Sequence, residues 1–78
     1  MKFSMRDNTI YIDAEQLMMR NFLRTNSILI VAIYDYELPL KAILQYEGSD
    51  YEIKQHTTQY ETRTRSTLHI YVCENVHG

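Results

Sequence analysis

The sequence predicts an α+β fold in which one amphipathic helix packs on an antiparallel sheet. Residues 28–33 form an unbroken apolar run rich in β-branched side chains, which is typical of a buried central strand and is far too short to cross a bilayer. Before this run, apolar residues recur at helical spacing, whereas in the rest of the chain they alternate with polar ones. The 78 residues are enough for a single small domain, residues 1–78, with the element order ββαββββ.

A hairpin and a helix are expected first. Residues 3–6 and 9–12 alternate between apolar and polar side chains, and Asp7-Asn8 between them tolerates the positive φ angles of a tight turn. Asp13 is a suitable helix N-cap, with Gln16 at the spacing of a capping box. We therefore predict a helix at residues 14–24, with an apolar face made of Met18, Met19, Phe22 and Leu23.

Further strands are expected after the central one. Residues 40–46 alternate again, following Leu38-Pro39, which forces an extended or turned backbone. The clearest turn signal of the chain is Glu47-Gly48-Ser49-Asp50, and alternation resumes at residues 51–55. These two strands are expected to form a hairpin.

The polar segment 56–66 is rich in threonine and contains neither glycine nor proline. Its β-propensity favours a long C-terminal hairpin that projects beyond the body, completed by a strand at residues 68–73, with a mobile loop as the alternative. The predicted core consists of Met18, Phe22, Leu23, Leu29, Val31, Leu44, Ile53, Leu68, Ile70 and Val72.

Composition limits the classes of function. Eight basic and ten acidic side chains give a net charge of -2, which argues against binding nucleic acid by bulk electrostatics. The charge is uneven, because residues 34–52 carry five acids against Lys41, a net of -4, whereas residues 53–67 carry a net of +2. Cys73 is the single cysteine, so an intramolecular disulfide and a cysteine zinc cluster are excluded and a cytoplasmic location is expected. No cofactor and no membrane association are predicted.

The segment Val31-Ala32-Ile33-Tyr34-Asp35-Tyr36-Glu37 resembles the ALYDYE segment that opens SH3 domains, where the tyrosines line a groove for proline-rich peptides. The resemblance covers seven residues. SH3 domains also have a tryptophan pair and a proline-serine-asparagine-tyrosine segment, and this sequence has no tryptophan and no proline after Pro39. The resemblance is therefore confined to this segment and carries neither fold nor function.

No catalytic or metal-binding motif stands out. His69 and Cys73 lie on one face of the last strand about 13 Å apart at the strand rise, too far to ligate one zinc ion. Small metal-independent RNases combine cations, which stabilise the phosphorane charge, with histidines, which transfer protons. A set of this kind would converge if the last two strands pair: His56, Tyr60, Arg63, Arg65, His69 and Tyr71. One alternative is therefore an RNase, or an RNA/DNA-binding protein that uses Lys54, His56, Arg63 and Arg65.

Seven tyrosines without a tryptophan favour a protein-binding surface, although tyrosine also suits half-buried strand positions. We predict a non-enzymatic protein-binding module that acts as a stoichiometric inhibitor or regulator of a larger macromolecular machine. Phage-encoded inhibitors of host machinery, including anti-CRISPR proteins, have this general profile. The second alternative is a structural subunit of a homo-oligomer, such as a homodimer. The predicted partner-binding residues are Tyr34, Asp35, Tyr36, Glu37, Tyr46, Tyr51, Tyr60, Arg63 and Arg65.

Overall fold

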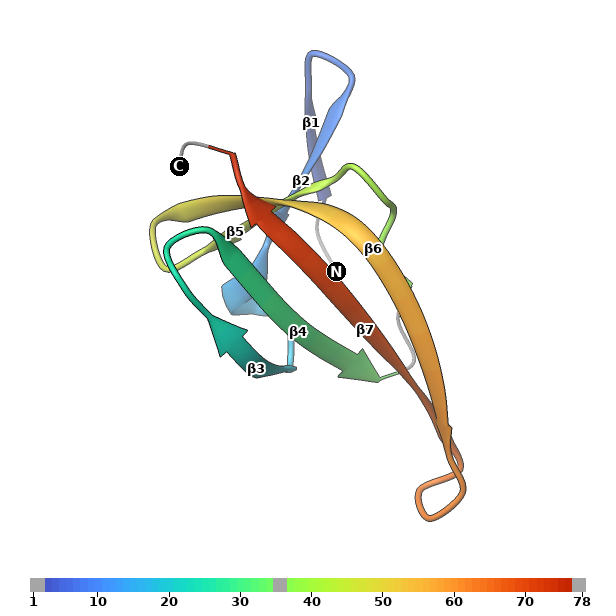
Figure 1. Cartoon of the computed structure of the whole chain (residues 1–78). Coiled ribbons are helices and arrows are strands. Elements are labelled where there is room, and N and C mark those ends of the chain that lie inside the picture. The colour runs from blue at the N-terminus through green and yellow to red at the C-terminus, as the bar shows by residue number, and fades with distance from the viewer. Residues whose placement is uncertain (1–2, 35–36, 77–78) are drawn as a thin grey trace.

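A computed structural model of the protein describes residues 3–34 and 37–76 and shows one seven-stranded mixed sheet (Figure 1). The strand order is β1-β2-β5-β6-β7-β4-β3, and every ladder is antiparallel except that between β2 and β5. No helix in these residues is long and apolar enough to span a bilayer. The elements are β1 (Phe3–Arg6), β2 (Thr9–Asp13), the 3-10 turn η1 (Ala14–Gln16), β3 (Met19–Arg24), β4 (Ile28–Tyr34), β5 (Ile43–Tyr46), β6 (Ser49–Glu61) and β7 (Ser66–Asn75).

The predicted α+β class is wrong, because the expected amphipathic helix is absent. Asp13 does cap a turn, since its Oδ1 accepts a hydrogen bond from Glu15 N at 3.0 Å, but the turn ends when Leu17 N donates to Ala14 O. The chain then becomes β3, which pairs with the central strand β4. An apolar strand such as β4 needs hydrogen-bond partners along both edges, and this tertiary requirement overrides the helical spacing of the local sequence.

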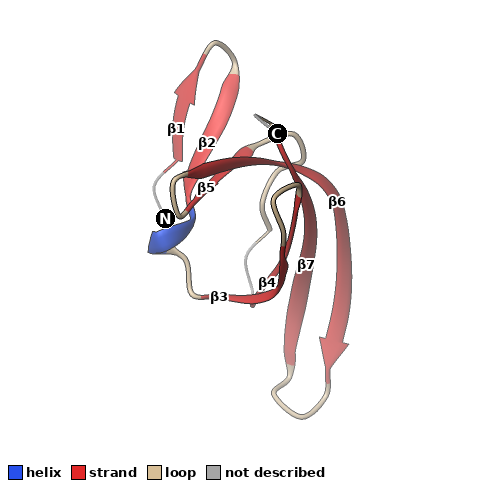
Figure 2. Ribbon diagram, turned by 60° about the vertical axis from the view of Figure 1, so that its left-hand side comes forward, coloured by secondary structure: helices blue, strands red, loops and turns tan. Residues whose placement is uncertain are grey.

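The hairpins expected from turn chemistry are present. Asp7 and Asn8 have φ angles of 49° and 64° in the turn between β1 and β2, and Glu47 and Gly48 have φ angles of 47° and 79° between β5 and β6. Residues 56–66 lie in the long β6–β7 hairpin, which extends away from the body at the end opposite the β1–β2 hairpin (Figure 2).

The sheet curls around the core as an incomplete barrel (Figure 2). Side chains close part of the gap between β3 and β5, which share no backbone ladder. Asn21 Nδ2 donates to Tyr46 OH at 3.2 Å, and Arg24 forms an ion pair with Glu47 in the β5–β6 turn. The closure is therefore made by side chains, and the outer edge of β3 keeps its unpaired backbone groups.

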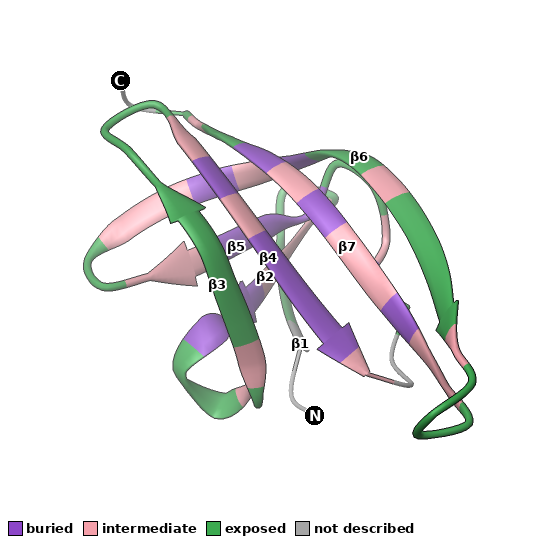
Figure 3. Ribbon diagram, turned by 60° about the horizontal axis from the view of Figure 1, so that its bottom comes forward, coloured by how far each residue is buried: buried purple, intermediate pink, exposed green. Residues whose placement is uncertain are grey.

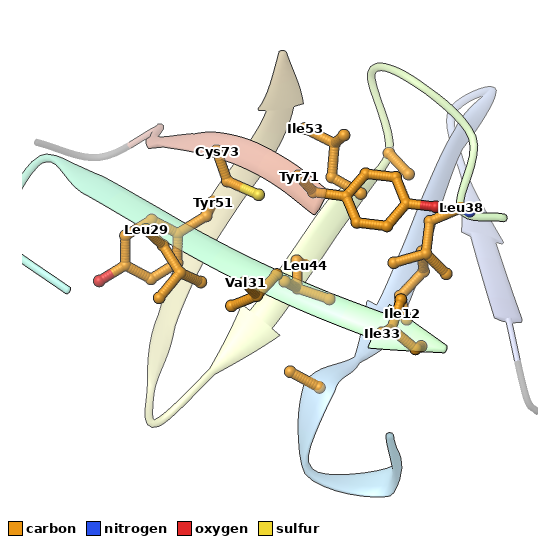
Figure 4. Close-up of a cluster of buried hydrophobic side chains, with 12 residues drawn as sticks. Ile12, Leu29, Val31, Ile33, Leu38, Leu44, Tyr51, Ile53, Tyr71 and Cys73 are labelled. Atoms are coloured by element: carbon orange, nitrogen blue, oxygen red, sulfur yellow. Dashed lines mark hydrogen bonds between the residues drawn. The ribbon is translucent and has the colours of Figure 1, made fainter. Parts of the chain in front are cut away.

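The core lies on the inner face of the curled sheet (Figure 4). β4 contributes Leu29, Val31 and Ile33 to it, and the two largest fully buried side chains are Tyr51 and Tyr71. Of the predicted core, the buried residues are Leu29, Val31, Leu44, Ile53 and Leu68.

The rest of the predicted core is wrong. Met18, Phe22 and Leu23 are 95%, 51% and 45% exposed, because the helix face that would have buried them does not form. In β7, Tyr71 and Cys73 face the core, while Ile70 and Val72 are half-buried on the opposite, outer face. Alternation alone selected the wrong face because β7 carries apolar side chains on both faces.

The first testable prediction concerns Cys73, because burial raises the pKa of its thiol to about 12 from the usual 9.0. Above pH 9.0 the unfolded chain loses this proton and the folded protein keeps it, so stability that is complete below that pH is lost as the pH rises towards about 12. Relative to Cys73→Ala, the free energy of unfolding should fall by about 1.4 kcal/mol per pH unit in this window. Urea unfolding of both proteins from neutral to alkaline pH checks this, and parallel pH profiles would contradict it.

Candidate functional site

The most distinctive surface lies along β3. This strand pairs with β4 on one edge only, and no other described strand pairs with it. All of its residues except the half-buried Met19 are exposed, as Figure 3 shows. The register with β4 shifts between Asn21 and Leu23, so that Phe22 sits at a bulge. We call residues 18–24 the β3 edge.

An apolar surface continues from the β3 edge across the outer face of the sheet. The strand registers place Leu23 beside Ile30 and Ile30 beside Val72, and in the next row Ala32 lies beside Ile70. Ile30, Ile70 and Val72 are only half-buried, although Ala32 is fully buried by its neighbours. Within the described residues there is neither a second sheet nor a helix longer than η1 to pack over this face.

A groove of about 750 Å³ opens at the start of the β3 edge. This volume is in the range of small-ligand pockets, and the walls are largely apolar. The groove is open to solvent and does not form an enclosed cavity. Its lining residues are Gln16, Leu17, Met18, Met19, Arg20, Ile33 and Tyr34.

The two arginines of the β3 edge have different surroundings. Arg24 pairs with Glu47 and lies over the Tyr46 ring, 5.2 Å from its centroid. Arg20 lies 5.8 Å from the Phe22 ring centroid, and no carboxylate of the described residues lies within 4.0 Å of its guanidinium. Arg24 is therefore neutralised within the chain, whereas Arg20 lies at the rim of the groove beside Tyr34 and has no carboxylate partner among the described residues.

Tyr34 lines the same groove and links it to the long hairpin. Its hydroxyl donates a hydrogen bond to Glu61, and this bond raises the pKa of Tyr34 because the carboxylate stabilises the protonated phenol. Arg20 acts in the opposite direction and lowers the pKa, which places the guanidinium close to the phenol oxygen. The groove is thus fixed on one side by a Tyr34–Glu61 contact between β4 and β6.

The tyrosine-rich surface predicted from the sequence does not form one patch. Tyr46 lies beside Arg24 at one end of the sheet, while Tyr34 lies at the other end of β4 beside Glu61. Tyr51 is 1% exposed, and its hydroxyl donates to Thr25 O at 3.5 Å, so it belongs to the core. Tyr60 is 60% exposed on β6.

The charged members of the predicted surface are also separated. Arg63 and Arg65 are exposed in the turn of the β6–β7 hairpin, and Glu37 is exposed beside His56, with 4.0 Å between its Oε1 and His56 Nδ1. Lys54 lies between two acids, 3.5 Å from Glu52 and 3.9 Å from Glu74. The remaining predicted residues, Asp35 and Tyr36, lie outside the described residues.

Pairing of β6 with β7 brings His56, His69 and Tyr71 together. His56 Nε2 and His69 Nδ1 are 2.8 Å apart and the ring centroids are 5.0 Å apart, so the two nitrogens lie near the line joining the rings. This is the geometry of a hydrogen bond in which one imidazole donates and the other accepts. An ion on this line could not lie 2.0–2.1 Å from both nitrogens, as zinc requires.

Three further observations separate this cluster from metal and RNase chemistry. Among the described residues, no three histidine, cysteine or acidic side chains are grouped to hold a metal ion. Tyr71 is fully buried and stacks on His56 at 4.7 Å, and its hydroxyl accepts a hydrogen bond from Leu38 N at 2.6 Å. Arg63 and Arg65 lie beyond the last β6–β7 pair, Glu61 with Ser66, which is about 10 Å along β7 from His69. The cluster therefore anchors the β4–β5 connection to the hairpin.

Sequence reasoning missed the β3 edge. The helical spacing of its apolar residues predicts a face turned towards the core. The signal that could have identified the edge is the neighbouring run 28–33, whose two apolar faces leave only its edges to be paired by other strands.

Comparisons with known proteins do not extend this picture. No protein-family model matches the sequence, and neither a curated protein nor a solved structure shows significant similarity to it.

The second prediction tests the anchoring role of Tyr71. Tyr71→Phe removes the acceptor of the Leu38 N–H, which is buried in this region, and should lower the free energy of unfolding by about 1–3 kcal/mol. Urea denaturation measures the loss. Tyr60→Phe is the matched control, because this exposed hydroxyl should contribute less than about 0.5 kcal/mol. Equal effects of the two substitutions would show that the Tyr71–Leu38 contact adds nothing to stability.

Proposed function

We propose that this chain is a non-enzymatic protein-binding module that binds its partner by strand addition along the β3 edge. One observation carries the proposal: among the described strands β3 pairs with β4 alone, it is exposed from Arg20 to Arg24, and it carries exposed Phe22 and Leu23, with exposed Met18 just before it. Unpaired N–H and C=O groups of such an edge bind an extended segment through main-chain hydrogen bonds, and the adjoining side chains provide specificity.

The composition of the edge supports a binding role over a passive surface. Proteins protect exposed edges with charge, proline, bulges or very short strands, because an open apolar edge promotes aggregation. The β3 edge has a bulge at Phe22 and two arginines, but Arg24 is already paired and Phe22 and Leu23 remain exposed. The other edge, β1, is only four residues long and belongs to a projecting hairpin (Figure 1).

The proposal includes the role of a stoichiometric inhibitor or regulator in the cytoplasm. A chain of this size can cover a site on a larger partner by adding one strand. A buried free thiol, Cys73, is consistent with a reducing compartment.

The two alternatives have weaker support. An RNase would need Arg63 and Arg65 to act with the histidines, but these residues are separated along the hairpin and His56 bonds His69. Nucleic-acid binding would use Lys54 with His56, Arg63 and Arg65, and Lys54 lies beside Glu52 and Glu74. A homo-oligomer formed through β3 would pair two strands that contain two arginines and no acidic residue, so no ion pair could form between them.

The third prediction is that charge on the β3 edge abolishes partner binding. The tagged protein is used for affinity capture from cells that naturally express it, together with Phe22→Glu and the control Met5→Glu, which alters an exposed apolar residue of β1. The wild type and Met5→Glu should retain one protein at equimolar ratio, and Phe22→Glu should bind it roughly 30-fold more weakly, as for the loss of an aromatic hot spot.

Three outcomes of this capture would contradict the proposal. These are the absence of an equimolar protein, equal loss of binding with Met5→Glu and Phe22→Glu, and capture of nucleic acid in a nuclease-sensitive complex. Circular dichroism and urea unfolding of each variant establish that the fold is retained before binding is compared.

A further inference from the structure

We propose that the groove at the start of the β3 edge selects the partner, and that it receives an extended acidic segment with a large apolar side chain. The apolar side chain would fill the groove and a carboxylate of the segment would pair with Arg20. This inference rests on the proposed function and names the chemistry of the partner that the same edge binds.

The position of the groove follows from the chain order around β3. Gln16 ends η1, Leu17 and Met18 lead from it to β3, which begins at Met19, and Ile33 and Tyr34 of β4 lie alongside. A segment that pairs with the first half of β3 therefore passes the mouth of the groove. In an added strand, alternate side chains point to the same face, so one of them can enter the groove while the next points away.

The lining favours an apolar anchor of variable shape. Leu17 and Met19 are half-buried and already pack against the core, whereas Met18 is 95% exposed at the rim. Methionine side chains are flexible and polarisable and adapt to differently shaped apolar partners. A groove of about 750 Å³ has room for a large aliphatic or aromatic side chain.

The charge at the rim of the groove is the second feature that would select the partner. Among the described residues, Arg24 has a carboxylate partner and Arg20 does not. An incoming carboxylate could accept charge-assisted hydrogen bonds from Arg20, at the rim of the apolar groove. The second half of β3 offers less access, because Asn21 and Arg24 already reach across to Tyr46 and Glu47.

A second copy of the chain fits this edge less well than an acidic partner. If two β3 strands paired antiparallel about their centre, Arg20 of one copy would face Leu23 of the other and Met19 would face Arg24. β3 contains no acidic residue, so a second copy would offer Arg20 no carboxylate across the ladder. An acidic segment supplies that carboxylate.

The test is selection of random linear peptides displayed on phage against the immobilised full-length protein. We expect enrichment of peptides that combine aspartate or glutamate with a nearby large apolar residue. Synthetic versions of these peptides should bind Arg20→Glu at least about tenfold more weakly, because a charge-assisted pair becomes a repulsion. Arg6→Glu, at an exposed arginine of β1, is the matched control and should bind as the wild type does.

The outcomes separate this inference from the proposed function. Peptides that lose binding with Phe22→Glu but are insensitive to Arg20→Glu would overturn the acidic-partner inference and leave strand addition at β3 intact. Enrichment of basic peptides, or of none, would also overturn it, whereas failure of Phe22→Glu to weaken any selected peptide would remove strand addition itself. A dimer seen by light scattering and dissociated by Phe22→Glu would show that a second copy is the occupant. Urea unfolding confirms that each variant is folded.

Discussion

The structure depends on the need of β4 to pair both of its edges. Residues 28–34 carry apolar side chains on both faces, so this strand cannot lie at the margin of the sheet without exposing them together with its backbone groups. β7 satisfies one edge through a ladder from Ile28 with Glu74 to Tyr34 with Leu68, and β3 satisfies the other. The inner residues Leu29, Val31 and Ile33 then organise the core, and the outer face is left between β3 and the long hairpin.

What could be predicted from the sequence is what short-range chemistry determines. Asp7-Asn8 and Glu47-Gly48 adopt positive φ angles because their residue types tolerate them, so two hairpins followed directly from local sequence. The helix at residues 14–24 could not be rejected in this way. Its spacing and its cap at Asp13 are compatible with a helix, and the choice of a strand depends on the distant edge of β4.

The same difference between local and long-range interactions explains which contacts of the candidate site could be predicted from the sequence. The contact of His56 with His69 and Tyr71 could be predicted from the sequence, because pairing the last two strands as a hairpin places these three residues near one another. The dispersal of Tyr34, Tyr46 and Tyr51 was not, since it depends on how far the sheet curls and on which faces are inside. The β3 edge was missed because its apolar residues were assigned to the core.

The open edge is a direct consequence of how the barrel closes. A sheet that joins its first and last strands by backbone hydrogen bonds has no edges, whereas here β3 meets the β5 region through side chains, such as Asn21 with Tyr46 and Arg24 with Glu47, and shares no ladder with another described strand besides β4. These contacts occupy β3 from Asn21 onwards and leave its first two residues beside the groove. Pairing β4 with β3 therefore transfers the unpaired edge from a fully apolar strand to one that carries Arg20 and a bulge at Phe22. Such an edge resists uncontrolled aggregation better than β4 would, yet it still offers backbone groups to a partner of matching charge.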